Sequence, residues 1–271
     1  GNVALNLKAL GVNTVLCSSI GIGKEGDSLI ELLKKQNLSD LAIHRSKDRS
    51  TTTKTRVIGN GHQLVRIDHE VLEDMTTLDS FLLQQHFERE LENADVVIMQ
   101  DYNKGVLHKG NIETLIEIAR KANIPVVVDP KKANFLAYKN VDLFKPNLKE
   151  IKEGLNIDTD LTTTEGVTEA IALMHEQLMN KVSMVTMSER GVLVSTADQQ
   201  YHTKAHIRNI SDVSGAGDTV ISIAACCLAT DCSLKQLSEL SNLGGGLVCE
   251  EKGVVPISKE RLISEAERIG L

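Results

Sequence analysis

Short apolar runs alternate with amphipathic helical stretches through most of this 271-residue chain. This alternation is typical of β-α units around a largely parallel sheet that is covered on both faces. The expected strands are 14–20, 95–100, 125–129, 141–145, 182–187 and 191–195, and the expected helices are 80–92, 111–122, 164–179, 216–230, 233–250 and 258–269. We therefore predict a three-layer α/β/α fold with a mostly parallel central sheet. The connections are short, which favours a single domain over residues 1–271.

One segment breaks this alternation. Residues 51–58 and 62–68 have the composition of two strands, and Gly59-Asn60-Gly61 between them is a strong β-hairpin signal. Polar and apolar residues are mixed on both alternating faces, so the hairpin is expected to stand off the main sheet. It could act as a lid over a ligand, with 51–68 as its bounds, or it could be an edge hairpin that closes nothing.

The composition disfavours several classes of function. Thirty basic and 37 acidic residues give a net charge of −7, which argues against binding to nucleic acid or to an anionic membrane. The five cysteines show no C-x-x-C spacing, so neither a metal site nor a disulfide framework is expected. No apolar run approaches the roughly 20 residues of a membrane span, and the chain does not begin like a signal peptide. We expect a cytoplasmic protein whose partners are small molecules.

The segment Asp212-Val213-Ser214-Gly215-Ala216-Gly217-Asp218-Thr219 precedes the apolar helical run 220–229. Small residues here let backbone N–H groups converge on an anion, and the helix N-terminus adds partial positive charge. Asp218 would repel a bound phosphate unless it accepted the proton of an attacking hydroxyl. Asp218 is therefore the candidate base, with the N–H groups of Gly215, Ala216 and Gly217 stabilising the transferred phosphate. From local sequence alone, a glycine turn that merely opens a buried helix is an equal alternative.

Polar residues follow four of the expected strands. The segments are Asp101–Gly105, Pro130–Lys132, Lys145–Glu150 and Ser188–Gly191. In an open α/β sheet the ligand lies outside the carboxyl ends of the strands. Lysines there can hold anionic groups, and a carboxylate such as Glu150 can orient Mg²⁺ through its waters. Each segment alone is also a common helix cap or turn, but together with the Gly215 turn they favour phosphoryl transfer.

Nucleotide-binding motifs of other folds are absent from the sequence. No Walker A pattern occurs, and the G-x-G-x-x-G spacing of Gly21–Gly26 leads into an acidic helix start. The acidic residue that would read a ribose about 20 residues later is missing as well. A dinucleotide-dependent oxidoreductase is therefore disfavoured.

The 212–219 segment, late in the chain and before a small-residue helix, resembles the motif of ribokinase-like (PfkB-type) carbohydrate kinases. Three further segments are similar to family motifs: Asn2–Ala4 leading to Leu10-Gly11, Asn147–Glu150, and Asn242–Gly246. The resemblance covers essentially the whole chain. Because the chain begins inside the sugar-binding motif, we expect the family's first strand to precede residue 1.

The resemblance implies ATP and Mg²⁺ as cofactors and a set of site residues. Asn147, Ser188, Glu189, Gly191 and Asn242 would lie on the nucleotide side, and Asn2 and Asp101 on the sugar side. Glu150 would hold Mg²⁺ through water, and the turn around Asp212 could hold K⁺, as in some relatives. Lid-bearing relatives often dimerise through the lid, so a homodimer is an expectation too.

Other segments resemble the heptose 7-phosphate kinase domains of bifunctional kinase–adenylyltransferases within that family. They are 53–57, 63–68, 101–107, 129–131 and 188–192. This resemblance implies phosphorylation of the anomeric hydroxyl of D-glycero-D-manno-heptose 7-phosphate, a step toward ADP-heptose and lipopolysaccharide. Lys104 and Lys131 would suit a substrate that already bears a phosphate. A kinase for ribose, fructose or fructose phosphate stays open as an alternative, as does an idle ligand-binding relative.

Overall fold

The computed structural model describes residues 1–59, 62–206 and 208–271. Within them the main sheet has six strands in the order β10-β9-β8-β7-β6-β5. Their bounds are β5 (Val97–Gln100), β6 (Val126–Asp129), β7 (Leu143–Phe144), β8 (Val182–Thr186), β9 (Val192–Ser195) and β10 (Gln200–Thr203). Strands β5 to β8 are parallel, whereas β9 and β10 run antiparallel to their neighbours. The expected mostly parallel sheet is confirmed.

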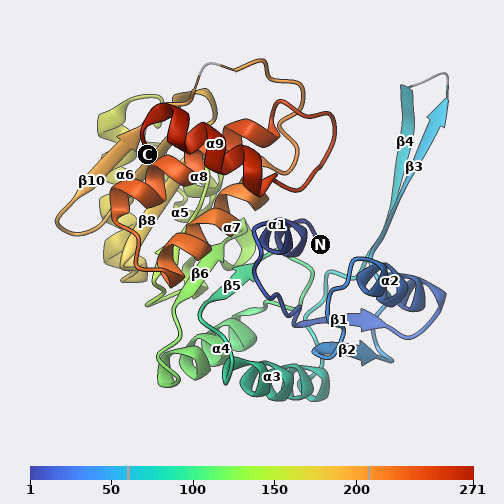
Figure 1. The fold of residues 1–271 in the computed structure, drawn as a ribbon. Coiled ribbons are helices and arrows are strands. Elements are labelled where there is room, and N and C mark those ends of the chain that lie inside the picture. Colours follow the sequence, from blue (N-terminus) through green and yellow to red (C-terminus); the bar gives the residue numbers. More distant parts are fainter. Residues whose placement is uncertain (60–61, 207) are drawn as a thin grey trace.

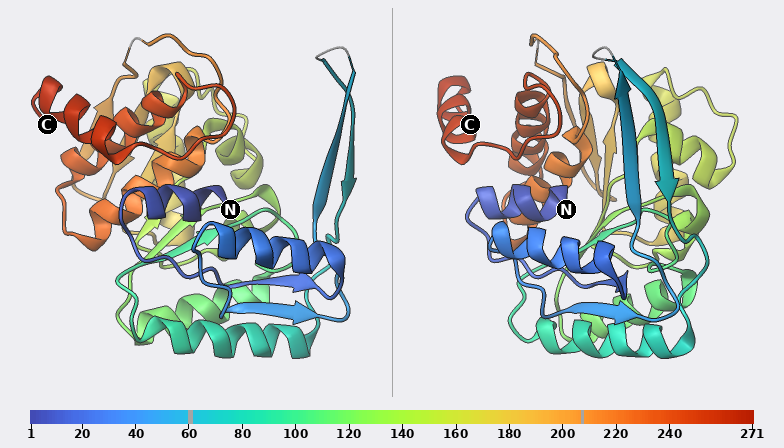
Figure 2. Two further views of the ribbon diagram at one scale, coloured as in Figure 1. Left: turned by 45° about the vertical axis from the view of Figure 1, so that its right-hand side comes forward. Right: turned by 90° about the vertical axis from the view of Figure 1, so that its right-hand side faces the viewer.

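Both faces of this sheet are buried under helices. Successive side chains of a strand point to opposite sides, so each strand contributes to two apolar clusters. Val127, Leu143 and Met184 face one apolar cluster, whereas their neighbours Phe144 and Val185 face another. The first cluster is covered by α1 (Asn2–Ala9), α7 (Ala216–Ala229), α8 (Leu234–Val248) and α9 (Lys259–Ile269). The second is covered by α3 (Thr77–Leu91), α4 (Lys109–Lys121), the 3₁₀ helix η1 (Lys132–Ala137), α5 (Leu148–Leu155) and α6 (Thr164–Leu178). The three-layer α/β/α fold is thereby confirmed (Figures 1 and 2).

A second, smaller sheet pairs β1 (Ser18–Gly21) with β2 (Ile43–Ser46) in parallel, next to α2 (Lys24–Lys35). The expectation that residues 14–20 join the main sheet was wrong. Ser18 and Ser19 at the start of β1 are only half-buried, so this strand does not carry the continuous apolar run of a doubly covered strand. The small sheet forms the base from which the hairpin leaves the body (Figure 1).

The hairpin consists of β3 (Thr53–Gly59) and β4 (His62–His69), paired antiparallel. It stands away from the main body in all three views (Figures 1 and 2), as the mixed alternation predicts, while Asn60 and Gly61 of the turn lie outside the described residues. Residues directly opposite each other share a face. The register Thr55↔Ile67 and Val57↔Val65 therefore gives one face three aliphatic side chains, all of them at least 40% exposed.

Candidate active site

The glycine turn lies at the start of α7. Gly215 is the N-cap residue and has φ +86°, a left-handed conformation that glycine adopts without strain. The first-turn N–H groups of Gly217 and Asp218 have no partner within the helix, whereas that of Ala216 already donates to the Val213 carbonyl at 3.3 Å. The turn therefore offers the N–H groups of Gly217 and Asp218 to an anion more readily than that of Ala216.

Asp218 is half-buried in the first turn of α7. Burial raises the pKa of its carboxyl, and the nearby charge of Asp129 adds to the rise. A hydrogen bond from the Asn2 side chain and the charge of Lys145 act in the opposite direction. Asn2, a predicted sugar-side residue, thus lies close to the carboxylate of Asp218, whose raised pKa makes it a stronger proton acceptor than an exposed aspartate.

A buried ion pair lies beneath the glycine turn. Lys145 Nζ is 3.0 Å from Asp129 Oδ1, and the two side chains are 4% and 8% exposed. Gln100 Nε2 donates to the other oxygen of Asp129 at 2.7 Å. A Cβ atom built on Gly217 would lie 3.9 Å from Lys145 Nζ. The ends of β5, β6 and β7 therefore bring a cation directly under the place where an anion would bind.

Lys145 belongs to one of the polar segments expected after the strands, whereas its partners Asp129 and Gln100 were not among the expected functional residues. Each occupies the end of an apolar strand or the position just after it. The available signal was a charged residue at the end of a run that is otherwise doubly buried, since such a charge needs a partner. The sequence does not tell which neighbouring strand supplies that partner.

Asp101 follows β5 and is 1% exposed. Its carboxylate accepts hydrogen bonds from the Tyr138 hydroxyl at 2.8 Å and from the Asn103 backbone N–H at 2.7 Å. The neighbouring Tyr102 is about half exposed, and its partial burial, followed by the charges of Asp218 and Asp129, raises its pKa. The loop after β5 therefore lies beside the start of α7.

Both predicted phosphate-binding lysines are engaged by glutamates. Lys104 Nζ forms an ion pair with Glu70, just beyond the hairpin, and Lys131 Nζ forms one with Glu150. The Lys131 pair joins a predicted substrate residue to the predicted metal residue. A substrate phosphate at either lysine would have to share or replace its glutamate, so this role stays a prediction.

Asn147 and Glu150 form a reciprocal capping box at the start of α5, the common alternative for such a pair. Glu150 N–H donates to Asn147 Oδ1 at 2.9 Å, and Asn147 N–H donates to Glu150 Oε2 at 3.0 Å. Both Glu150 oxygens thus have partners. Among the described residues, no three or more His, Cys, Asp or Glu side chains form a metal-binding group. The role of Glu150 toward Mg²⁺ therefore stays a prediction.

Two of the predicted nucleotide-side residues, Gly191 and Asn242, lie against the end of β10 and the segment that follows it. Ser188 and Glu189 are exposed in the 3₁₀ helix η2 (Ser188–Arg190). Gly191 has φ +86°, and a Cβ there would lie 2.0 Å from the Thr203 carbonyl oxygen. Asn242 on α8 is buried and donates to the Lys204 carbonyl at 2.9 Å. The structure therefore brings Gly191 and Asn242 to the same short segment.

Asp212, the predicted potassium residue, closes the turn before α7. Its carboxylate accepts hydrogen bonds from the backbone N–H groups of Ser214, at 2.9 Å, and of Gly253. Hydrogen bonds from Ser214 hold the pKa of Asp212 below its ordinary value, so the carboxylate is ionised near neutral pH. An ionised oxygen in a turn fits a cation ligand, and the potassium role stays a prediction.

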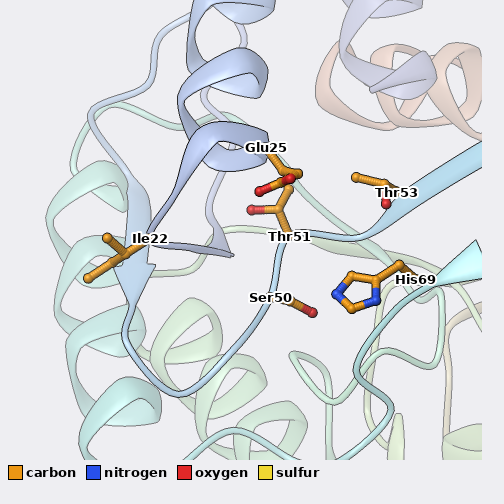
Figure 3. A pocket seen from close by; sticks show the side chains of 6 residues that line it. All are labelled: Ile22, Glu25, Ser50, Thr51, Thr53 and His69. Carbon is orange, nitrogen blue, oxygen red and sulfur yellow. The ribbon is translucent and has the colours of Figure 1, made fainter.

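A cavity of about 360 Å³ lies at the base of the hairpin. Its lining comes from the end of β1, the start of α2 and the roots of β3 and β4, as Figure 3 shows: Ile22, Glu25, Ser50, Thr51, Thr53 and His69. Hydroxyl, carboxylate and imidazole groups dominate this lining. Such groups can donate hydrogen bonds to, or accept them from, the hydroxyls of a sugar.

A mostly parallel sheet whose strand ends meet a glycine turn, a carboxylate and a buried lysine is the arrangement expected of an α/β phosphotransferase. The model of the pfkB family carbohydrate kinases matches residues 1–261, and the chain belongs to this family. It is accordingly a phosphotransferase that acts on a sugar hydroxyl. Within the described residues, every helix falls short of the length and apolarity that a membrane span needs.

Similar sequences include bifunctional HldE proteins. The protein from Coxiella burnetii (strain Dugway 5J108-111) is 35% identical over 262 residues, covering 96% of this chain and 54% of that protein. The protein from Haemophilus influenzae (strain PittEE) is 33% identical over 276 residues, covering 96% and 53%. This chain thus spans about half the length of the curated relatives it matches.

Solved structures with the same fold are more distant in sequence. Phosphofructokinase-2 from Escherichia coli in complex with potassium gives a TM-score of 0.83 at 20% identity, covering 100% of this chain and 86% of that chain. Arabidopsis thaliana ribokinase complexed with ribose and ATP gives 0.75 at 17% identity, covering 97% and 85%. These similarities confirm the ribokinase-like fold.

Proposed function

We propose that this chain transfers the γ-phosphate of ATP to the anomeric hydroxyl of D-glycero-D-manno-heptose 7-phosphate, giving the 1,7-bisphosphate. The observation that carries phosphoryl transfer is the placement of Asp218 at the glycine turn, above the buried Lys145–Asp129 pair. The choice of heptose phosphate rests on the subfamily segments in the sequence. Similarity to HldE proteins along nearly the whole chain supports it.

Asp218 is the general base in this proposal. Its carboxylate takes the proton of the anomeric hydroxyl while the oxygen attacks the γ-phosphorus of ATP, and the phosphorus–oxygen bond to ADP breaks. The hydrogen bond from Asn2 orients the carboxylate. Its raised pKa supports the role, because a base works best when its pKa approaches the working pH.

Negative charge on the transferred group is met from two sides. The free N–H groups at the start of α7 point at the phosphoryl oxygens from one side. Lys145 lies beneath Gly217 and supplies a full positive charge in a site that is largely closed to water. Asp129 holds the lysine in place until the phosphate arrives.

Mg²⁺ neutralises the phosphates of ATP when it is bound. Glu150 would hold one of its waters, and Asn147 would keep that carboxylate in position through the capping box. Ser188, Glu189, Gly191 and Asn242 would line the nucleotide side. Asp212 would bind K⁺ beside the turn, and this proposal is favoured by the same fold in a potassium complex of phosphofructokinase-2.

The sugar would lie between the strand ends and the hairpin, which acts as its lid. Asn2 and Asp101 would contact the sugar near Asp218, and the cavity at the root of the hairpin would take its far end (Figure 3). Lys104, beside Glu70, and Lys131, beside Glu150, would turn toward the 7-phosphate when it binds. The aliphatic face of the hairpin would also pair with a second copy in a homodimer.

The substrate assignment can be tested with a panel of acceptors at fixed ATP. We expect kcat/KM for heptose 7-phosphate to exceed that for ribose and for fructose 6-phosphate by on the order of a hundredfold or more. Unphosphorylated heptose should show a higher KM, and phosphorus NMR should detect a second phosphate at the anomeric position. A preference for fructose 6-phosphate or ribose would contradict the substrate, and ADP formation with no sugar of the panel would contradict the assignment as a sugar kinase.

A further inference from the structure

The C-terminal end of α7 brings two cysteine side chains together. The backbone N–H of Cys232 donates to the Cys227 carbonyl at 2.9 Å, and that of Asp231 donates to Leu228 at 3.4 Å. Asp231 has φ +53°. These features define a Schellman motif, in which the residues at the positions of Cys227 and Cys232 commonly contact each other through their side chains. Here the Cys232 thiol is near enough to contribute to the raised pKa of the Cys227 thiol.

The backbone geometry is compatible with a covalent bridge. A disulfide requires Cα atoms about 4.4–6.8 Å apart. The 2.9 Å hydrogen bond from Cys232 N to Cys227 O, with standard bond lengths on either side, holds the two Cα atoms within about 6.8 Å. Because the turn already brings the two Cα atoms this close, a bond between the sulfurs needs rotation of side chains and little movement of backbone.

The two thiols differ in their access to solvent. Cys227 is 4% exposed, and burial first, then its cysteine neighbours, raises the pKa of its thiol. Cys232 is half-buried, with its sulfur 3.4 Å from the Thr230 hydroxyl. An oxidant from solvent therefore reaches Cys232 first, and Cys227 is placed behind it. The third cysteine of the segment, Cys226, comes one residue before Cys227 and is not one of the two residues that the Schellman motif pairs.

We propose that Cys232 and Cys227 form an oxidisable dithiol, a modification site that closes to a disulfide when the protein meets a hydroperoxide. The sulfur of Cys232 attacks the peroxide, forming a sulfur–oxygen bond and breaking the oxygen–oxygen bond, and one water leaves when the oxidant is hydrogen peroxide. Cys227 sulfur then attacks that of Cys232, forming the disulfide and releasing a second water. Two thiols are oxidised by two electrons in total, and one peroxide is reduced.

The position of the dithiol predicts what its closure would do. Cys227 lies nine residues after Asp218 on the same helix, about 13 Å along the axis, so closure does not touch the reacting atoms. It would tie the end of α7 to the residue before Ser233, the N-cap of α8. We expect kinase turnover to stay within about twofold after oxidation, and the melting temperature to rise by a few degrees because the turn is fixed covalently.

The test uses the whole chain exposed to a small excess of hydrogen peroxide, followed by alkylation of remaining thiols. The tryptic peptide 209–235 contains the three cysteines of this segment. We expect it to lose two hydrogens and to carry a single alkyl group, on Cys226. Cys226→Ser should still form the bridge, whereas Cys232→Ser and Cys227→Ser should not. Because Cys232 is half-buried, Cys232→Ser keeps the test valid if the Cys227 variant does not fold.

Several results would overturn the proposal. Sulfinic acid on Cys232 with Cys227 still alkylated would show that the contact is only apolar packing at a turn. A bridge from Cys226 to Cys232, or one between two chains, would show that the Schellman geometry does not select the partner. An unchanged melting temperature in the bridged protein would contradict the expected fixing of the turn.

Discussion

The strand ends under α7 and the β3–β4 hairpin meet the proposed sugar from opposite sides, and they are built in opposite ways. At the strand ends, Asp101, Asp129 and Lys145 are each buried and held by side-chain partners. On the hairpin, every residue of β4 is exposed. Groups that must hold a transition state are fixed by the core. A part that must admit and release substrate is drawn from the least stable end of the fold.

Replacing Asp218 with Asn tests the rigid side most severely. We expect turnover to fall by about three or more orders of magnitude, because a general base acts mainly in the transition state, with ATP affinity largely intact. Steady-state kinetics and binding of an ATP analogue measure the two effects. Asp198→Asn, an exposed change between β9 and β10, is the matched control. Near-normal turnover in the Asp218 variant would remove it as the base.

Breaking the buried pair should affect the fold and the chemistry together. Lys145→Met leaves Asp129 buried and uncompensated, at a cost of about 3–5 kcal/mol in the free energy of unfolding. The double variant Lys145→Met, Asp129→Asn should recover most of that stability, since Gln100 can still donate to the amide oxygen. Turnover should not recover with it. Denaturant unfolding and kinetics on the three proteins check both points, and recovered turnover would exclude Lys145 from phosphate binding.

The raised pKa of Asp218 predicts opposite effects of pH on activity and on stability. The folded carboxyl holds its proton more tightly than the unfolded one, so stability falls as the pH rises from the ordinary value of 3.8 through the folded pKa. Asp218→Asn removes this loss and should melt higher than the native protein at neutral pH, but not below about pH 3.8. Turnover of the native protein should fall as the pH is lowered through the same folded pKa. Melting curves measured against pH show whether the variant is more or less stable than the native protein. A variant less stable at neutral pH would mean that the interaction of Asp218 with Asn2 outweighs the cost of burying the carboxylate.

Substitution of an exposed residue on the hairpin should give the smallest change in the free energy of unfolding. Leu64 on β4 is 69% exposed, whereas Leu143 on β7 is fully buried. Leu64→Ala should change the free energy of unfolding by no more than about 0.5 kcal/mol, against about 2–5 kcal/mol for Leu143→Ala. Sedimentation of the Leu64 variant should be unchanged, because Leu64 lies on the face of β4 opposite to Val65 and Ile67. A large loss of stability in that variant at a concentration where the protein is monomeric would show that the hairpin packs on the body.

Local pattern was enough to predict the parts of the fold that depend on near neighbours. The doubly covered strands, the hairpin and the glycine turn before α7 all follow from spacing and residue type within a few positions. Which strands pair with each other could not be predicted in the same way. Residues 14–20 look like a strand, but nothing local says that β1 pairs with β2 and not with the main sheet.

The same limit applies to the site. The charge of Lys145 was visible, yet its pairing with Asp129 depends on the order of β6 and β7 in the sheet. The bond from Tyr138 to Asp101 joins residues 37 positions apart and depends on where η1 folds back. Asn147 and Glu150 show a different ambiguity, because a capping box and a metal-orienting pair share one spacing. Only the contacts separate such cases.

The amide of Asn6 on α1 links distant parts of the chain. Its side-chain oxygen accepts hydrogen bonds from the Thr219 hydroxyl, 213 positions away, and from the Ile257 N–H, 251 positions away. Contacts of such long range slow folding, because the intervening loop must close before they form. A ribosome will therefore have added nearly all of these residues before the Asp218 turn can settle against α1. Until then the base of the enzyme has no firmly fixed position.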